Sequence, residues 1–206
     1  KTPLHVAGEK HDGIAPNGGG SNFTVKGCVP FLDAMTSGYI FTTPCDVEVS
    51  VMNDRFVMRW TVDYTPVSSH SPDKAGLMAK RSVHEPHPFK WHTAWTIKTP
   101  PGYSTMFVHP INRYDLPFRS FGGVVETDTY EVGTQFPFQI TQEYDGTPFI
   151  IPEGTPIIQA IPFKRENWKG YEIKEDEELE LTSFNNLRSK IARSYKEKFW
   201  VRKTYS

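Results

Sequence analysis

Two carboxylates, Glu126 and Asp128, stand two positions apart in a stretch that ends at Tyr130. Residues i and i+2 of a strand face the same way, so both side chains would project from one face. Close carboxylates hold their pKa values apart and can divide acid and base roles between them. Tyr130 would add a ring for stacking on a base. The competing interpretation is a polar strand end or turn with no catalytic role.

A second group of residues has the chemistry for binding a small anion. Asn112 and Arg113 lie in a polar stretch, and a guanidinium is a planar fork that fits carboxylate or phosphate. Gln159 is the one polar side chain in an apolar run, where an unpaired buried amide costs roughly 1–3 kcal/mol. We therefore expect ligand contacts from Asn112, Arg113, Tyr130 and Gln159. A structural Arg–Asp pair and an amide that only pins strands together are the alternatives.

Three histidines, His84, His87 and His92, form a cluster that also includes Glu85. A transition-metal site needs three or four ligands converging on one ion. Pro86 lies between two of the histidines and argues against a helical pair. We expect unliganded histidines here, with no metal and no cofactor. A Zn or Fe site is the alternative if the three rings converge.

The composition indicates short strands and many turns. Of 206 residues, 14% are aromatic, 17 are Pro and 15 are Gly, a balance that disfavours long helices. A net charge of −1 generates no field that would attract nucleic acid or an anionic membrane. Two cysteines do not make a disulfide framework, so a reducing, cytoplasmic setting is expected. The sequence has no apolar run of about 18 residues that would span a membrane.

Alternating patterns predict several strands. Residues 46–63 form a predicted hairpin with Asn53 and Asp54 in its turn, because both residue types tolerate positive φ. A second hairpin is expected over residues 94–98 and 103–109, and a strand pair over 123–126 and 135–141. Residues 150–163 are typical of two buried strands joined by a tight turn.

The remaining stretches divide the chain into an arm, a core and a tail. Residues 1–22 are predicted to be a flexible N-terminal arm, residues 23–170 a β-rich core, and residues 171–206 an acidic linker with an amphipathic helix at about 184–200. Within the core, residues 64–92 lack sustained periodicity and are expected to form a long loop. The fold class is therefore mostly β, with a C-terminal α-helix and an extended N-terminal arm.

Three segments in chain order resemble the dUTPase and dCTP deaminase group, which has a β-clip fold. They are residues 37–40, 122–130 and 153–159, and residues 101–103 lie where the family places a strand-opening Pro-x-Gly. The resemblance covers roughly residues 36–163 and implies a β-clip or barrel-like core. The whole chain also resembles a family of phage and marine bacterial proteins, through residues 28–33, 95–104 and 161–166, which implies a phage or virion setting.

The departures from the nucleotide-hydrolase pattern concern the catalytic groups. Ile40 stands at the position of a carboxylate and Glu126 at that of an aspartate, while residues 109–113 replace the phosphate-binding Arg-Ser-Ser. Hydrolysis of a triphosphate needs several donors, a metal and a placed water. The sequence therefore favours a scaffold without that activity.

These observations lead to one expected function and two alternatives. We expect a non-enzymatic structural or interaction protein that forms a homo-oligomer, with a trimer as one option. We expect neither a membrane nor nucleic acid as a partner. The first alternative is a nucleotide- or small-anion-binding protein, or an enzyme like a nucleotidohydrolase or deaminase. The second is a metal-dependent β-barrel enzyme that uses His84, His87 and His92.

Overall fold

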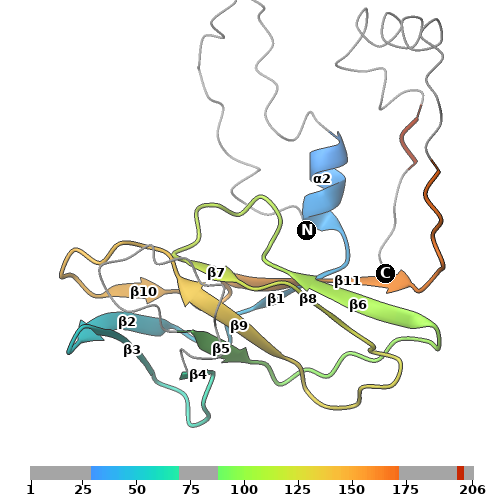
Figure 1. The fold of residues 1–206 in the computed structure, drawn as a ribbon. Helices are drawn as coiled ribbons and strands as arrows, with labels where there is room; N and C mark the ends of the chain where they lie inside the picture. Colours follow the sequence, from blue (N-terminus) through green and yellow to red (C-terminus); the bar gives the residue numbers. More distant parts are fainter. Residues whose placement is uncertain (1–28, 70–87, 172–198, 202–206) are drawn as a thin grey trace, which may run out of the picture. The chain divides into compact units, whose positions relative to one another are not determined.

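The computed structural model describes residues 29–69, 88–171 and 199–201, and this part of the chain is mostly antiparallel β-structure (Figure 1). The chain divides into two compact units, residues 38–165 and the flanking residues 1–37 with 166–206. The larger unit contains all the described strands, which belong to three sheets. The expectation of a mostly β fold is confirmed, whereas the barrel-like closure is wrong because the described strands form separate sheets.

Sheet A has the strand order β1 (Tyr39–Thr42), β11 (Pro156–Lys164), β6 (Tyr103–Val108) and β8 (Gly123–Val125). The long strand β11 lies between β1 and β6 and buries the run from Ile157 to Ala160. Gly38, at φ +65°, leads into β1, and a Cβ there would collide with the carbonyl oxygen of Ala160. Only glycine therefore allows β1 to approach β11 so closely.

Sheet B has the order β10 (Phe149–Ile151), β2 (Val47–Met52) and β3 (Arg55–Trp60). The predicted hairpin at 46–63 is confirmed, since β2 and β3 pair from Val47↔Trp60 to Met52↔Arg55. Asn53 and Asp54 form its turn with φ +50° and +63°. Two left-handed residues give a turn whose twist matches that of the flanking strands.

Sheet C has the order β4 (Val67–Ser69), β5 (Phe89–His92), β9 (Gln135–Ile140) and β7 (Phe118–Ser120). The expectation of a loop over residues 64–92 is wrong at both ends, because β4 and β5 lie there. These strands have three and four residues, too few for an alternating pattern to stand out.

Two predicted pairings are also wrong, although most of their strands exist. Residues 94–98 form no strand, and β6 pairs instead with β11 and β8. Strands β8 and β9 lie in different sheets, so the expected pair of 123–126 with 135–141 does not form. Residues 150–163 do contain two strands around a turn, but β10 pairs with β2 while β11 pairs with β1 and β6. The partners come from distant parts of the chain, which local patterns do not reveal.

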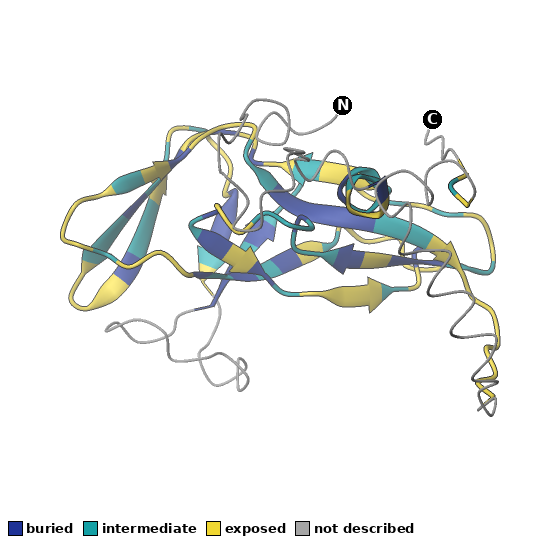
Figure 2. Cartoon of the chain, turned by 90° about the horizontal axis from the view of Figure 1, so that it is seen from above, coloured by how far each residue is buried: buried dark blue, intermediate teal, exposed yellow. Residues whose placement is uncertain are grey.

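Aromatic side chains of sheets A and C contact one another in the core of the larger unit. Figure 2 shows the buried stretches of the strands in dark blue. Trp91 stacks on Phe138 with ring centroids 4.2 Å apart and planes at 11°. Phe118 meets the Trp91 ring edge-on at 5.4 Å. Phe107 of sheet A and Phe136 of sheet C lie 5.0 Å apart and join the two layers. Such aromatic pairs stabilise by about 0.5–1.5 kcal/mol beyond their area burial.

The other unit contains the described helix α2 (Val29–Thr36), which local patterns in the sequence did not predict. Pro30 lies in its first turn, where no intrahelical N–H bond is lost. Trp200 Nε1 donates to Asp33 Oδ2 at 2.9 Å. The predicted arm at 1–22 lies outside the described residues, as does the predicted helix at 184–200 except for its end at Phe199 and Trp200, which is not helical. No described helix is long and apolar enough to cross a membrane.

Candidate functional site

A groove with a volume of about 820 Å³ lies beside strand β1 in the larger unit. It is lined by β1, residues 92–100, Pro44, Tyr64, Tyr103, and two residues of β11, Ala160 and Pro162. Three of its aromatic side chains are open to solvent: Trp95 is 70% exposed, Tyr39 52% and Tyr64 51%. We call this feature the aromatic groove. Its size is within the range of small-molecule and peptide pockets.

The strand side of the aromatic groove is held by sheet A. Tyr39 pairs with Ala160 across β1 and β11, and both residues line the groove. Phe41, two positions further, continues the same face and packs on Phe136 at 6.1 Å. The groove therefore lies at the edge of the core that forms where sheets A and C pack together.

The opposite side of the groove is the irregular segment of residues 93–100, which is anchored at its end by Thr99. The Thr99 backbone N–H donates to the carbonyl oxygen of Thr127 at 3.2 Å. The hydroxyl groups of Thr99 and Thr127 lie 2.7 Å apart, and that of Thr127 lies 2.8 Å from the hydroxyl of Thr105. Thr105 and Thr127 are buried. This chain of three hydroxyl groups fixes the groove wall to strand β6.

The polar side chains of the groove are mainly tyrosine and threonine hydroxyl groups, which can both donate and accept hydrogen bonds. The buried Thr93 hydroxyl has no hydrogen-bond partner within the described structure. The His92 Nε2 atom lies 2.7 Å from Ser68 Oγ, and burial lowers the pKa of this ring, with the charge of Lys90 adding to the effect. Lys98 forms a 3.0 Å ion pair with Glu131 in which both side chains are exposed. The groove is therefore close to electrically neutral.

Among the residues predicted from sequence, Asn112, Arg113 and Gln159 lie around the turn that follows β6. Gln159 is fully buried, and its Oε1 accepts a 3.0 Å hydrogen bond from the backbone N–H of Ile111. Asn112 adopts φ +62° in this turn. The Arg113 guanidinium donates to both carboxylate oxygens of Asp115, at 2.7 and 2.8 Å. Gln159 and Arg113 thus have the intramolecular partners that the structural alternatives expected, and the Arg113 charge is already neutralised.

His109 organises the same turn. Its Nδ1 accepts from the Ser120 backbone N–H at 3.2 Å, so Nε2 carries the hydrogen and donates to the Arg113 carbonyl at 2.9 Å. Burial lowers the pKa of His109, and the hydrogen bond to the Arg113 carbonyl opposes this shift. A neutral ring with both nitrogens engaged holds the turn in place and leaves no ring nitrogen for a ligand.

Glu126, Asp128 and Tyr130 lie on the turn after β8, which ends at Val125. The strand-borne carboxylate pair is therefore wrong and the turn interpretation is confirmed. Arg165 forms a two-pronged ion pair with Asp128, whose side chain is only 5% exposed and also accepts from the Gly102 N–H at 2.9 Å. The hydrogen bonds from Arg165 lower the pKa of Asp128 to about 2. Asp128 is thus held as a carboxylate and has no proton to donate near neutral pH.

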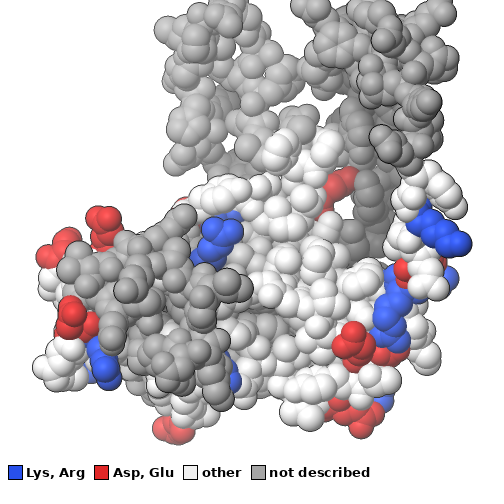
Figure 3. Space-filling view, viewed as in Figure 1, with Lys and Arg blue, Asp and Glu red and all other residues white. Residues whose placement is uncertain are grey.

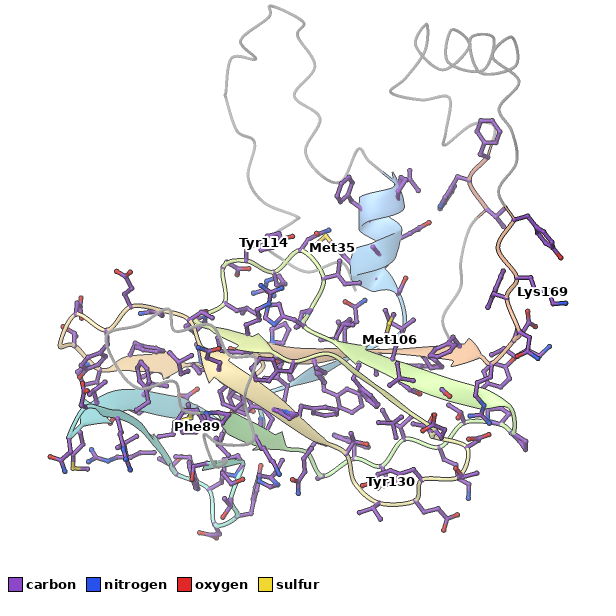
Figure 4. The ribbon with its side chains drawn as sticks, viewed as in Figure 1. Met35, Phe89, Met106, Tyr114, Tyr130 and Lys169 are labelled. Atoms are coloured by element: carbon purple, nitrogen blue, oxygen red, sulfur yellow. The ribbon has the colours of Figure 1, made fainter. Side chains whose placement is uncertain are left out.

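The two predicted groups lie at opposite ends of β6. Gln159 is opposite Val108 and Lys164 is opposite Tyr103, so the six residues of β6 separate the groups by roughly 17 Å. In Figure 4, the labelled Tyr114, which follows Arg113 in the chain, also lies well apart from Tyr130. The structure therefore brings each group together internally but does not combine them into one pocket.

The histidine cluster is described only in part. His84 and His87 lie outside the described residues, while His92 contacts Ser68 and lines the aromatic groove. Within the described ranges, no three or more His, Cys, Asp or Glu side chains are placed to hold a metal ion.

The residues of the aromatic groove were missed as functional candidates. Trp95 was placed in an expected strand, and Tyr39 in a family-like segment, so neither was considered as a ligand contact. The sequence signal was the aromatic content of 14%, which does not show which rings stay exposed. No model of a known protein family matches this chain, and no curated protein matches it.

Proposed function

We propose that this protein is a non-enzymatic interaction protein that binds an uncharged partner in the aromatic groove. The observation that carries the proposal is the exposure of Trp95, Tyr39 and Tyr64 along one groove. Trp and Tyr are enriched among the residues that dominate binding energy, because they bury large area at low entropic cost. An aromatic cluster left open to solvent is stabilised when a partner covers it.

The nucleotide- and anion-binding alternative receives less support. Two cations near its predicted residues already have carboxylate partners: Arg113 pairs with Asp115, and Arg165 pairs with Asp128. A bound phosphate would have to displace a bidentate ion pair in each case. On the face seen in Figure 3, charged side chains gather toward the two ends of the larger unit and leave an uncharged surface between them.

A thermal-shift screen separates these functions. The screen holds peptides, oligosaccharides and nucleotides, the last with and without Mg²⁺. A ligand at 100 times its dissociation constant stabilises by about 2.7 kcal/mol. We expect stabilisation by an uncharged ligand, lost in Trp95→Ala and kept in Tyr114→Ala, whose side chain is 90% exposed and does not line the groove. Stabilisation by a nucleotide that survives Trp95→Ala and is lost in Arg113→Gln would refute the proposal.

We also retain the proposal that the protein is a homo-oligomer built on a β-clip related to the dUTPase group. The three family-like segments overlap β1, β8 and β11, and these three strands belong to the same sheet. One face of sheet A carries Met106 opposite both Ile161 and Val124, and Phe163 continues it. Apolar faces of this kind occur at subunit interfaces. A monomer at micromolar concentration in light scattering would remove the oligomer proposal, and phage or virion partners would be sought only after an oligomer is found.

A further inference from the structure

Building on the proposed function, we infer that the partner binds as an extended, uncharged chain that pairs with the open edge of β1 and places alternate apolar side chains in the aromatic groove. Strand β1 stands at one end of the order of sheet A, and no described strand pairs with its outer side. A strand in that position presents unpaired backbone donors and acceptors to an incoming chain. Strand addition draws affinity from these backbone hydrogen bonds and specificity from pockets for alternate side chains.

The direction of the backbone groups of β11 follows from the end of that strand. The Arg165 N–H donates to the Gly102 carbonyl oxygen at 2.8 Å, one pair beyond the Lys164↔Tyr103 register. Directly opposed residues of antiparallel strands exchange hydrogen bonds only at every second pair. Counted back from Arg165, the odd-numbered residues of β11 therefore bond to β6. The even-numbered residues, including Ala160, direct their N–H and C=O groups toward β1.

The same alternation identifies the open groups of β1. Tyr39 lies opposite an even-numbered residue of β11, so its backbone groups face that strand. Thr43 also faces β11, because its N–H donates to the Thr155 carbonyl oxygen at 2.8 Å. Ile40 and Thr42 therefore direct their N–H and C=O groups away from sheet A, and among the described residues no backbone hydrogen bond from outside the sheet reaches them. Two donors and two acceptors are thus available to a partner strand.

The aromatic groove runs along this open edge. All four residues of β1 line it, although their side chains alternate between two faces. A cavity over one face alone would be lined by only two of them, so the lining includes the backbone edge of the strand. Phe41 packs on Phe136 of sheet C, and Tyr39 projects from the same face. Residues of a partner strand opposite Tyr39 and Phe41 would project there too, into the groove that Trp95 also lines.

The size and charge of the groove favour a single extended chain. A volume of about 820 Å³ between β1 and residues 93–100 admits one short segment, whereas β1 of a second copy would bring its own sheet with it. The four residues of β1 span roughly 13 Å, which a segment of about six residues covers. Strand β1 has no charged residue, and Lys98, the one Lys or Arg in the described lining, is paired with Glu131. The segment should therefore be uncharged where it meets the groove.

The first test measures amide hydrogen exchange in the free full-length chain. The amides of Ile40 and Thr42 should exchange at least tenfold faster than those of Tyr39 and Phe41, which bond to β11. Slow exchange at Ile40 and Thr42 would show that the edge is already occupied. The occupant is a second copy if dilution speeds up the exchange, and another segment of this chain if it does not. Either result overturns the inference.

The second test titrates the full chain with a capped hexapeptide in which threonine and valine alternate, and with two analogues of it. One analogue is N-methylated at the threonines and the other at the valines, so each has only one edge able to pair. Binding is followed by NMR through the Trp95 indole N–H, assigned with Trp95→Phe. We expect the parent and one analogue to bind, and the other analogue to bind at least tenfold more weakly. If both analogues bind as the parent does, the edge of β1 is not used, and the inference falls while the proposed function stands.

Two proline variants give a matched comparison between the edges of sheet A. Ile40→Pro removes an outward N–H from β1 and no hydrogen bond to β11, and should weaken binding of the parent peptide about tenfold. Val124→Pro removes the corresponding N–H from β8 at the opposite edge, since Val124 lies opposite Met106, whose backbone groups face β11. It should leave binding unchanged, and thermal unfolding checks that both variants fold.

Contrary results separate this inference from the function on which it rests. Wild-type affinity for the parent peptide in a folded Ile40→Pro variant would overturn the inference. Should that variant not fold, the N-methylated analogues still decide, because they leave the protein unchanged. If neither the peptide nor any ligand from the thermal-shift screen shifts the groove signals, the proposed function falls as well.

Discussion

The hydroxyl chain of Thr99, Thr127 and Thr105 provides the sharpest test of how the groove wall is held. Thr127→Val keeps the volume of the side chain and removes the central hydroxyl, which lies 2.7 Å from one neighbour and 2.8 Å from the other. Each hydrogen bond contributes about 0.5–1.5 kcal/mol net. Losing both should lower the free energy of unfolding by about 2 kcal/mol.

The same substitution leaves the Thr105 hydroxyl, which is fully buried, without a partner. The double variant Thr105→Val with Thr127→Val removes both members of that bond and strands neither. Its cost should therefore be smaller than the sum of the two single variants, by about 1 kcal/mol. Urea unfolding measures these values, and for a chain of this length 1 kcal/mol corresponds to roughly 2–4 °C in Tm.

A suitable control is Thr129→Val on the same turn, because the Thr129 hydroxyl is exposed and reaches the Glu126 carbonyl only at 3.4 Å. It should change stability by less than about 0.5 kcal/mol. Amide exchange in residues 94–100 should speed up in Thr127→Val and not in the control. The reasoning is refuted if Thr127→Val unfolds like the wild type, or if the single variants add without coupling.

Three further outcomes follow from the polar contacts. Because the folded-state pKa of His109 lies below its ordinary value of 6.5, its contribution to stability should be complete above that pH and decline as pH falls below it. His109→Asn keeps an acceptor for the Ser120 N–H and should flatten this part of a profile of unfolding free energy against pH. An unchanged slope would show that His109 is not the titrating group. The Asp128 carboxyl has a pKa of about 2, below its ordinary value of 3.8. It therefore contributes stability that is complete above pH 3.8 and is lost as pH falls toward 2. Carbon-13 titration of its carboxyl signal checks this, and a midpoint near 3.8 would disprove the pairing with Arg165. Gln159→Met leaves the Ile111 N–H unpaired and should lower the free energy of unfolding in urea by about 1–3 kcal/mol. A loss below about 0.5 kcal/mol, which is typical of ordinary surface substitutions, would show that the amide is dispensable.

Local patterns predicted the features that depend on neighbouring residues. The alternation in β2 and β3 and the Asn53–Asp54 turn were predictable because both are encoded within a few positions. The burial of Gln159 was predictable from the apolar run around it, and so was its need for a partner. The partner itself, the backbone of Ile111, lies 48 positions away and has no local signature.

The missed features depend on contacts between distant residues. Strand β5 is short, and its Trp91 acquires a role only when it stacks on Phe138, which lies on β9. The predicted site residues failed as a unit for the same reason: β6 holds Gln159 and Asp128 at its opposite ends. Trp95 looked like a strand residue because its neighbours are β-branched or aromatic. Its exposure follows from the irregular path of residues 93–100, which Thr127 holds from another part of the chain.

The position of β11 in sheet A also has a consequence for biosynthesis. Among the described strands, β11 is the last in chain order, and it lies between β1 and β6. Tyr39 therefore cannot pair with Ala160, and sheet A cannot form, until more than a hundred further residues have been synthesised. A ribosome adds about 5–20 residues per second, so the nascent strands spend several seconds with their hydrophobic faces uncovered. Chaperone protection is most valuable in that interval, and a message truncated before the codon for Pro156 would yield a product that cannot assemble sheet A.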